Sequence, residues 1–284
     1  MTEHFVRLHD GRRLCFAEYG DLDGFVVVNA HGGFACRLDV AAADDVAREA
    51  GIRLISPDRP GVGQSDTLPG RTVLDWAADL VQLTNHLGVE RFSVMGWSMG
   101  GPYAAAAAYA MPSRVSRVAI IAGALPLDES GKFEQLPRMD RVYTRLSQRA
   151  PWVARSCFRV MRWAAGVAPS TYGRSAARSL GPADGAVIRE EGFDAFARMS
   201  REALRQPSGV VEEYRAWARA WGFAPEDVGV ATDVWAGTDD ELLDPRWPRE
   251  LADRMPGATL HVCSGGHFMA HRHYREIFDA LRMS

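Results

Sequence analysis

The amino-acid sequence predicts an α/β fold with a mostly parallel central sheet, helices on both of its faces and an inserted helical cap. Short apolar runs rich in β-branched residues alternate with helix-spaced apolar residues over the first 125 positions, which is typical of repeated βαβ units. This strand pattern stops after Leu127 and returns at Val230. We therefore expect a core made of residues 1–126 and 226–284, with residues 127–225 forming the cap.

Each expected element has a local reason. A turn at Asp10-Gly11 between two short strand-like segments predicts an edge hairpin over 5–8 and 14–19. Three apolar segments, at 25–30, 52–56 and 92–95, are continuous enough to be strands covered on both faces, and further strands are expected at 115–122, 230–235 and 259–262. Helical spacing predicts helices at 40–50, 72–87, from Met99 onward, 246–254 and 273–282, and Gly88 is expected to end the second of them. The small side chains of the alanine run 104–108 indicate a helix lying close against the sheet.

Composition and charge exclude several classes of protein. The 284 residues are 47% hydrophobic and 24% charged, with a formal net charge of -3, which is ordinary for a globular protein and indicates neither a nucleic-acid partner nor a membrane partner. The start of the chain lacks a basic segment followed by an apolar one, so we expect a cytoplasmic protein. The four cysteines are scattered without paired spacing and are expected to be small buried hydrophobic residues rather than a zinc site or a disulfide framework.

The segment Gly96-Trp97-Ser98-Met99-Gly100 matches G-x-S-x-G at the point where an expected strand ends and a helix begins. In that context the serine takes a strained backbone conformation that exposes its hydroxyl, and glycines two positions away let strand and helix approach. The helix N-terminus directs backbone N–H groups at the serine, so the Met99 N–H is a candidate donor to an oxyanion. The alternative, an incidental glycine-rich turn, is open on this motif alone.

Two later loops supply partners for a nucleophilic serine. Asp239 and Asp240 follow the expected strand at 230–235, and His267 follows the strand at 259–262. Since both loops lie at the carboxyl edge of a parallel sheet, where active sites of open α/β sheets collect, the chain order serine, acid, histidine predicts a catalytic triad.

With these three segments the chain resembles the α/β-hydrolase-fold serine hydrolases, esterase-like and with a helical cap. The segments His31-Gly32-Gly33-Phe34 and 58–65 also resemble family loops at corresponding places. The resemblance implies that Ser98 is the nucleophile, His267 the general base and Asp240 the orienting acid, with Asp239 and Asp128 as alternatives to Asp240. A serine at this position argues against the related dehalogenase and epoxide hydrolase branches, which attack with aspartate.

The resemblance also assigns the second oxyanion donor to the backbone N–H of Gly33, with Phe34 as the fallback, because Phe34-Ala35 replaces the usual Pro-Gly. Phe34 and Trp97 are expected to contact substrate. His31 reads as a loop histidine that bonds the backbone rather than a second base, and the pair Asp58-Arg59 reads as a loop-stabilising turn.

The sequence gives weaker support for a metal site or a nucleotide cofactor. His267 and His271 have H-x-x-x-H spacing, but no carboxylate follows at ligand spacing, so we predict no metal and surface positions for His271 and His273. The nucleotide-binding glycine patterns are absent from the sequence, so no cofactor is implied.

The cap carries a charge surplus and several large aromatic residues. Residues 128–225 hold 16 Lys and Arg against 11 Asp and Glu. Helical spacing places Arg141, Arg145 and Arg149 in one stripe and Arg155, Arg159 and Arg162 in another. These stripes are either solvated faces or a surface for an anionic acyl carrier. Some of the cap aromatics are expected to form an apolar pocket at the serine, but the sequence does not say which.

The sequence therefore predicts a serine hydrolase that cleaves a small or medium apolar carboxylic ester through an acyl-enzyme intermediate. Thioesterase, lactonase, aminopeptidase, C–C hydrolase and acyltransferase activities use the same triad and stay open. A non-catalytic ligand receptor of the same fold is the alternative from another class.

Overall fold

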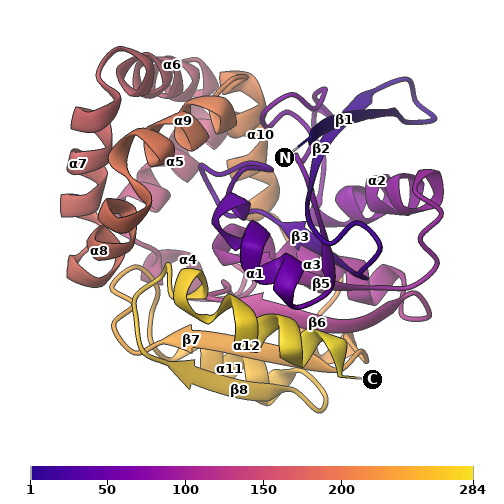
Figure 1. The fold of residues 1–284 in the computed structure, drawn as a ribbon. Coiled ribbons are helices and arrows are strands. Elements are labelled where there is room, and N and C mark those ends of the chain that lie inside the picture. Colours follow the sequence, from indigo (N-terminus) through magenta and orange to yellow (C-terminus); the bar gives the residue numbers. More distant parts are fainter. Residues whose placement is uncertain (1, 284) are drawn as a thin grey trace.

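The computed structural model describes residues 2–283, which contain one sheet in the strand order β1-β2-β4-β3-β5-β6-β7-β8 (Figure 1). The strands are β1 Thr2–Arg7, β2 Arg13–Gly20, β3 Phe25–Ala30, β4 Ile52–Pro57, β5 Phe92–Trp97, β6 Val115–Ile121, β7 Thr232–Gly237 and β8 Thr259–Cys263. The edge pairs β1-β2 and β2-β4 are antiparallel, and the other neighbours are parallel. The α/β class and the mostly parallel sheet are confirmed.

The helices alternate with the strands in the core and run consecutively in the insertion. The α-helices are α1 Asp44–Glu49, α2 Val73–His86, α3 Gly101–Ala110, α4 Lys132–Gln135, α5 Arg138–Arg149, α6 Pro151–Val167, α7 Pro169–Ser179, α8 Pro182–Glu191, α9 Phe193–Ala203, α10 Pro207–Trp217, α11 Trp247–Arg254 and α12 Ala270–Arg282. Short 3-10 turns lie at Ala41–Ala43, Ser98–Gly100 and Pro225–Asp227.

The expected elements are present, and their ends differ for local reasons. The first strand begins at Thr2 because pairing with Glu18 in β2 extends the ladder beyond the apolar run. Helix α2 lies where the sequence predicted it, with a Thr72 capping box at its start and Gly88 at φ +66° just after its end. Helix α12 starts at Ala270 rather than His273, where a non-helical φ of -126° interrupts it.

Neighbouring side chains on each central strand enter two different apolar layers. In β3, Val28 packs with the layer under α2, α3 and α11, whereas Val27 packs with the layer under α1 and α12. Met95 and Val94 divide between the layers in the same way, which is the two-faced burial of a parallel sheet. The alanine run is fully buried in α3, so its backbone lies close to the sheet, as predicted.

Helices α5–α10 form the inserted helical region on one side of the sheet (Figure 1). Helix α4 precedes them and contacts the core instead, through Lys132 Nζ to Glu250 and through Trp247 Nε1 to Gln135, both at 2.6 Å. The boundaries at 127 and 225 stay an expectation.

Two further features concern membranes and thiols. Within residues 2–283, no helix has the length and apolarity needed to cross a bilayer.

All four cysteines are free. Cys15 and Cys36 are buried as expected, but Cys157 and Cys263 are only half-buried, because each lies on the partly exposed side of its element.

Candidate active site

Ser98 lies in a strained turn at the carboxyl end of β5. Its backbone φ is +54°, a left-handed value that residues with a side chain seldom adopt. A Cβ added to Gly100 would lie 1.9 Å from the Ala30 carbonyl oxygen, and one added to Gly96 would lie 2.3 Å from the Gly100 carbonyl oxygen. The turn therefore needs glycine at both positions, as the pentapeptide predicts.

His267 and Asp240 form a direct pair. The Nδ1 atom of His267 lies 2.9 Å from Oδ2 of Asp240. The other carboxylate oxygen of Asp240 accepts the backbone N–H groups of Leu242 and Leu243 at 2.8 and 3.1 Å. A carboxylate held in this way fixes the imidazole tautomer and leaves Nε2 as the basic nitrogen.

The two alternative acids lie elsewhere. Asp239 is exposed and accepts the Thr238 hydroxyl at 2.9 Å. Asp128 is also exposed. Of the acids that the sequence offered, Asp240 is the one that the fold brings to His267.

Trp97 connects the serine turn to the histidine loop. Its indole N–H donates to the His267 carbonyl oxygen at 2.8 Å, and its ring centroid lies 5.6 Å from that of His267. Because Ser98 directly follows Trp97, this contact holds the serine turn beside the loop that carries the histidine.

Two cap carboxylates near the histidine were missed by sequence reasoning. Asp184 of α8 is buried, and its Oδ1 accepts the Phe268 N–H at 2.8 Å. Asp140 of α5 accepts the Tyr214 hydroxyl at 3.0 Å. Nothing in the spacing of these residues identifies them, since they come from separate cap helices and meet the histidine loop only when the cap folds over the core.

The surrounding charges set the protonation of the pair. Burial opposes a charged imidazole, but Asp240, together with Asp184 and Asp140, outweighs it and raises the pKa of His267 above its usual value. Burial likewise acts to raise the pKa of Asp240, but the neighbouring His267 and the backbone N–H donors lower it below its usual value. The site therefore favours a charged pair.

The two predicted oxyanion donors belong to neighbouring residues in space. A Cβ added to Gly33 would lie 3.1 Å from Met99 Cε, so the loop after β3 runs beside the start of the helix that follows Ser98. Phe34 has a φ of +54° and directs its ring into the cap, where it packs against Tyr143, Phe158 and Tyr214 with centroids 5.5 to 5.7 Å apart.

His31 bonds the backbone of this loop, as expected. Its Nε2 accepts the Arg59 N–H at 3.2 Å, so Nδ1 carries the proton and donates to the Gly32 carbonyl oxygen at 2.9 Å. Burial and the nearby Arg59 guanidinium lower the pKa of His31 to about 3. A histidine that stays neutral and satisfied on both nitrogens serves structure rather than proton transfer.

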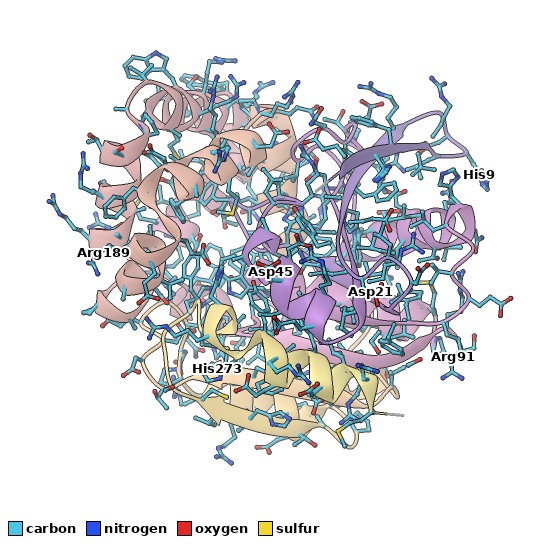
Figure 2. All side chains as sticks on the ribbon, in the orientation of Figure 1. His9, Asp21, Asp45, Arg91, Arg189 and His273 are labelled. Carbon is cyan, nitrogen blue, oxygen red and sulfur yellow. The ribbon has the colours of Figure 1, made fainter. Side chains whose placement is uncertain are left out.

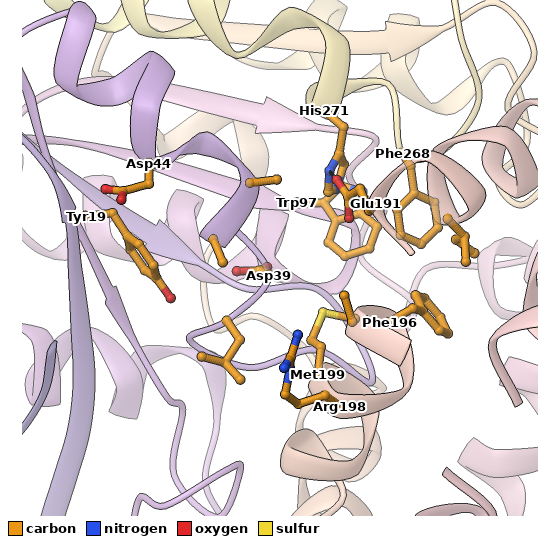
Figure 3. Close-up of a pocket in the computed structure, with 15 residues that line it drawn as sticks. Tyr19, Asp39, Asp44, Trp97, Glu191, Phe196, Arg198, Met199, Phe268 and His271 are labelled. Carbon is orange, nitrogen blue, oxygen red and sulfur yellow. Dashed lines mark hydrogen bonds and ion pairs between the residues drawn. The ribbon is translucent and has the colours of Figure 1, made fainter. Parts of the chain in front are cut away.

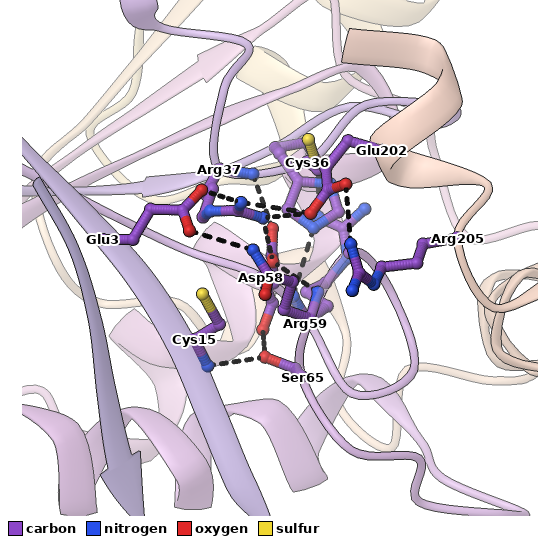
Figure 4. A network of polar contacts seen from close by, with 12 residues as sticks. Glu3, Cys15, Cys36, Arg37, Asp58, Arg59, Ser65, Glu202 and Arg205 are labelled. Carbon is purple, nitrogen blue, oxygen red and sulfur yellow. Dashed lines mark hydrogen bonds and ion pairs between the residues drawn. The ribbon is translucent and has the colours of Figure 1, made fainter. Parts of the chain in front are cut away.

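Buried charges anchor the cap to this loop. The Arg59 guanidinium donates to the carbonyl oxygens of His31 and Gly32 and pairs with Glu213 of α10, which also lies 3.4 Å from Arg71. We name Arg59, Arg71 and Glu213 the cap latch. Figure 4 shows a neighbouring network in which Arg37 bridges Asp58 of the core, at 2.7 Å, and Glu202 of the cap, at 3.1 Å.

A cavity of about 550 Å³ opens between α8–α9 and the core (Figure 3). Its apolar wall includes Trp97, Phe196 and Phe268, and Asp39, Glu191 and Arg198 add charge. Ser98 and His267 do not line it, but their chain neighbours Trp97 and Phe268 do. Of the two residues expected to contact substrate, Trp97 borders this space and Phe34 does not.

The remaining histidines do not gather around a metal. His271 pairs with Glu191, and His273 Nε2 lies 3.0 Å from the Ser264 carbonyl oxygen. Both are half-buried rather than on the surface as predicted, because His271 lies against Glu191 of the cap and His273 against the loop at Ser264. Among the described residues, no group of three or more His, Cys, Asp or Glu side chains could hold a metal ion.

Comparisons with known proteins agree with this fold. Residues 26–274 match the family described as alpha/beta hydrolase fold. Two solved structures resemble the chain along nearly its whole length: an esterase from Thermogutta terrifontis (TM-score 0.72, 22% identity, covering 99% of this chain and 97% of that one) and a hydrolase from Pseudomonas aeruginosa (TM-score 0.73, 16% identity, covering 98% and 96%).

A curated relative matches over a shorter stretch. The proline iminopeptidase of Xanthomonas citri is 32% identical over 123 residues, which is 42% of this chain and 38% of the relative. The chain thus matches well under half the length of that relative.

A mostly parallel sheet with a strained serine turn at its carboxyl edge and a histidine–carboxylate pair beside it defines a hydrolase of the α/β class. The chain belongs to the alpha/beta hydrolase fold family, whose match spans most of its length.

Proposed function

We propose that this protein is a serine hydrolase that cleaves a small or medium apolar carboxylic ester through an acyl-enzyme. The observation that carries the proposal is the 2.9 Å contact between His267 Nδ1 and Asp240, on a loop joined through Trp97 to the strained turn of Ser98. A pure binding protein has no need of a serine held at positive φ.

The proposed reaction has two steps. The Ser98 hydroxyl attacks the ester carbonyl carbon while His267 Nε2 takes its proton, and the alcohol leaves with that proton. Water then attacks the acyl-enzyme, with His267 again taking and returning the proton, which releases the carboxylic acid and restores Ser98. The backbone N–H groups of Met99 and Gly33 hold the oxyanion in both steps, and Asp240 stabilises the protonated imidazole.

The cavity between cap and core, whose wall includes the direct chain neighbours of Ser98 and His267, supports a substrate of modest size. Its volume of about 550 Å³ and its wall of Trp97, Phe196, Phe268 and Met199 suit an apolar acyl or alcohol group. Similar structures include an esterase, which is consistent with an ester as the bond cleaved.

The first experiment is a p-nitrophenyl ester series, from acetate to long acyl chains, on wild type and Ser98→Ala, with fluorophosphonate labelling read by intact mass. We expect a burst, turnover and one adduct in the wild type, and neither turnover nor adduct in Ser98→Ala. The preferred chain length then measures the acyl site.

Two other results would change the proposal. Labelling of Ser98 without ester turnover would favour a thioester, an amide, a C–C bond or an acyl acceptor other than water, which product analysis with an added alcohol or amine separates. Failure of Ser98 to label in folded protein would favour a ligand receptor of this fold.

A further inference from the structure

Positive charge is concentrated in the first half of the cap. Residues 138–180, which cover α5, α6 and α7, hold nine arginines and a single acidic residue, Asp140. The remaining residues hold 24 Lys and Arg against 35 Asp and Glu. Asp140 is turned toward Tyr214 of α10, so it does not offset the arginines on the outer surface. A net charge of -3 conceals this segregation.

Helix α6 has two apolar faces, and one of them has no cover within the described residues. Ala154, Phe158 and Ala165 face inward and are buried. On the opposite side, Trp152 and Trp163 are 68% and 65% exposed. Val160 and Val167 on the same side are also exposed.

Helical geometry gathers these exposed residues into one stripe. Eleven residues separate Trp152 from Trp163, which is close to three whole turns, so both rings lie on the same side, about 16 Å apart along the axis. Arg155 and Arg159 are exposed along one border of this stripe, and no ion pair engages either of them within residues 2–283. We name Trp152, Arg155, Arg159, Val160, Trp163 and Val167 the outer face of α6.

We propose that the outer face of α6 docks on an anionic membrane surface. Tryptophans and valines would enter the boundary between headgroups and acyl chains, while the arginines contact anionic headgroups. Figure 1 shows α6 at the outer edge of the cap, on the side away from β7 and β8, so a flat surface can reach the helix. This proposal replaces the expectation of no membrane partner, which rested on net charge.

The charge and shape of the face favour this occupant over others. A second copy of the chain would set arginines against arginines across a two-fold axis, which like-charge repulsion disfavours. A peptide or protein partner usually anchors aromatic residues in a well-packed pocket. These tryptophans instead lie on the exposed side of a helix, beside arginines that form no ion pair among the described residues, which is the composition of an interfacial helix.

The test is cosedimentation of the full-length protein with vesicles of phosphatidylcholine alone or with 30 mol% phosphatidylglycerol added. We expect binding that is at least tenfold stronger with the anionic lipid, weakens with added salt and shifts the tryptophan fluorescence to the blue. Arg155→Gln with Arg159→Gln should weaken binding about thirtyfold, from about fivefold for each arginine near the surface. Trp152→Ser with Trp163→Ser should weaken it at least tenfold.

Matched controls remove the same charge or apolar area elsewhere. Arg91→Gln with Arg249→Gln changes two exposed arginines, of which Arg91 lies at the opposite end of the molecule from the cap (Figure 2). Leu22→Ser with Val262→Ser changes two side chains that are 61% and 60% exposed. Both controls should bind like wild type, and all variants should keep the wild-type circular dichroism because the changed side chains are exposed.

Three results would overturn the proposal. They are absence of binding to anionic vesicles at low salt, equal binding to both lipid compositions, and equal loss in the α6 variants and the controls. Binding to immobilised polyglutamate through α6 without binding to vesicles would assign this face to an acidic protein instead.

Discussion

At the scale of single residues, three carboxylates from different parts of the chain act on the pKa of His267. Asp240 contacts it directly, while Asp184 and Asp140 reach its surroundings from the cap. Together they raise the pKa of His267, so the acid limb of activity should lie above the ordinary imidazole value of about 6.5 that sequence alone suggests.

The first prediction concerns that limb. In the proposed mechanism the neutral imidazole of His267 is the base, so kcat/KM should fall as pH drops through the raised pKa of His267. Asp184→Asn removes a negative charge near the ring and should move the limb to lower pH, with Asp253→Asn, an exposed change in α11, as the control. The measurement is kcat/KM on a p-nitrophenyl ester from pH 4.5 to 9. An unmoved limb in Asp184→Asn would count against this electrostatic role.

The second prediction concerns the turn that carries Ser98. Gly100→Ala places a Cβ 1.9 Å from the Ala30 carbonyl oxygen, so the turn must shift. We expect the fluorophosphonate labelling rate of Ser98 to fall at least tenfold, because misplacement of the nucleophile by about 1 Å has effects of this size or larger. Gly229→Ala, which meets open space, should label like wild type. Equal labelling of both variants would contradict a close-packed turn.

At the scale of elements, the cap latch joins α10 to the loop that carries the predicted oxyanion donor. Glu213 is buried between the guanidinium groups of Arg59 and Arg71. The two arginines act on Glu213 strongly enough to lower its pKa below the usual value, although burial opposes this. The carboxylate is therefore charged when the cap is closed on the core.

The third prediction is that Glu213→Gln destabilises the fold by about 3 to 5 kcal/mol, because it leaves buried positive charge without a partner. The adjacent Glu212→Gln removes the charge from a partly exposed carboxylate that pairs with Arg215 and accepts the Gly70 N–H, and it should cost less than about 1 kcal/mol. Urea unfolding measures both. A cost for Glu213→Gln no larger than that for Glu212→Gln would mean that the pairing of Glu213 with the two arginines contributes little to holding the cap.

At the scale of the whole molecule, the uneven charge should govern behaviour in solution more than the net charge of -3 does. The fourth prediction is retention on a sulfonate cation exchanger at pH 7 and low salt, despite the negative net charge, because α5–α7 present a local positive surface. Arg155→Gln with Arg159→Gln should elute at clearly lower salt than Arg91→Gln with Arg249→Gln. Flow-through of the wild type would contradict the segregated surface.

The fifth prediction concerns stability and pH. Asp39 is buried, and burial raises its pKa to about 7. A raised carboxyl pKa means that the folded state holds the proton more tightly than the unfolded chain, so this group weakens folding as pH rises from about 4 to about 7. One pKa unit corresponds to about 1.4 kcal/mol. The stability of wild type relative to Asp39→Asn should therefore fall by about 2 to 4 kcal/mol between pH 4 and pH 8, and a constant difference would contradict the shift.

Much of the fold follows from sequence because its causes are local. Helical spacing over 72–87, the glycine at 88 and the apolar strand segments placed their elements to within a few residues. Three loops at strand ends could be placed at one sheet edge, since parallel strands share their carboxyl edge. The pairing of His267 with Asp240 rather than with Asp239 agrees with that placement.

By itself, then, the sequence determined the α/β class, the strained serine turn and the chain order of the proposed triad, because strand periodicity, turn chemistry and motif spacing act between near neighbours. Tertiary structure alone decided which cap aromatics are buried, as Phe158 is, and which face solvent, as Trp163 does. It also decided that Asp184 contacts the loop of His267 and that Glu213 pairs with Arg59 beside the loop of the predicted oxyanion donor. The physical reason is that burial and charge pairing depend on which surfaces of the helices pack together, and helical spacing alone does not specify the partner.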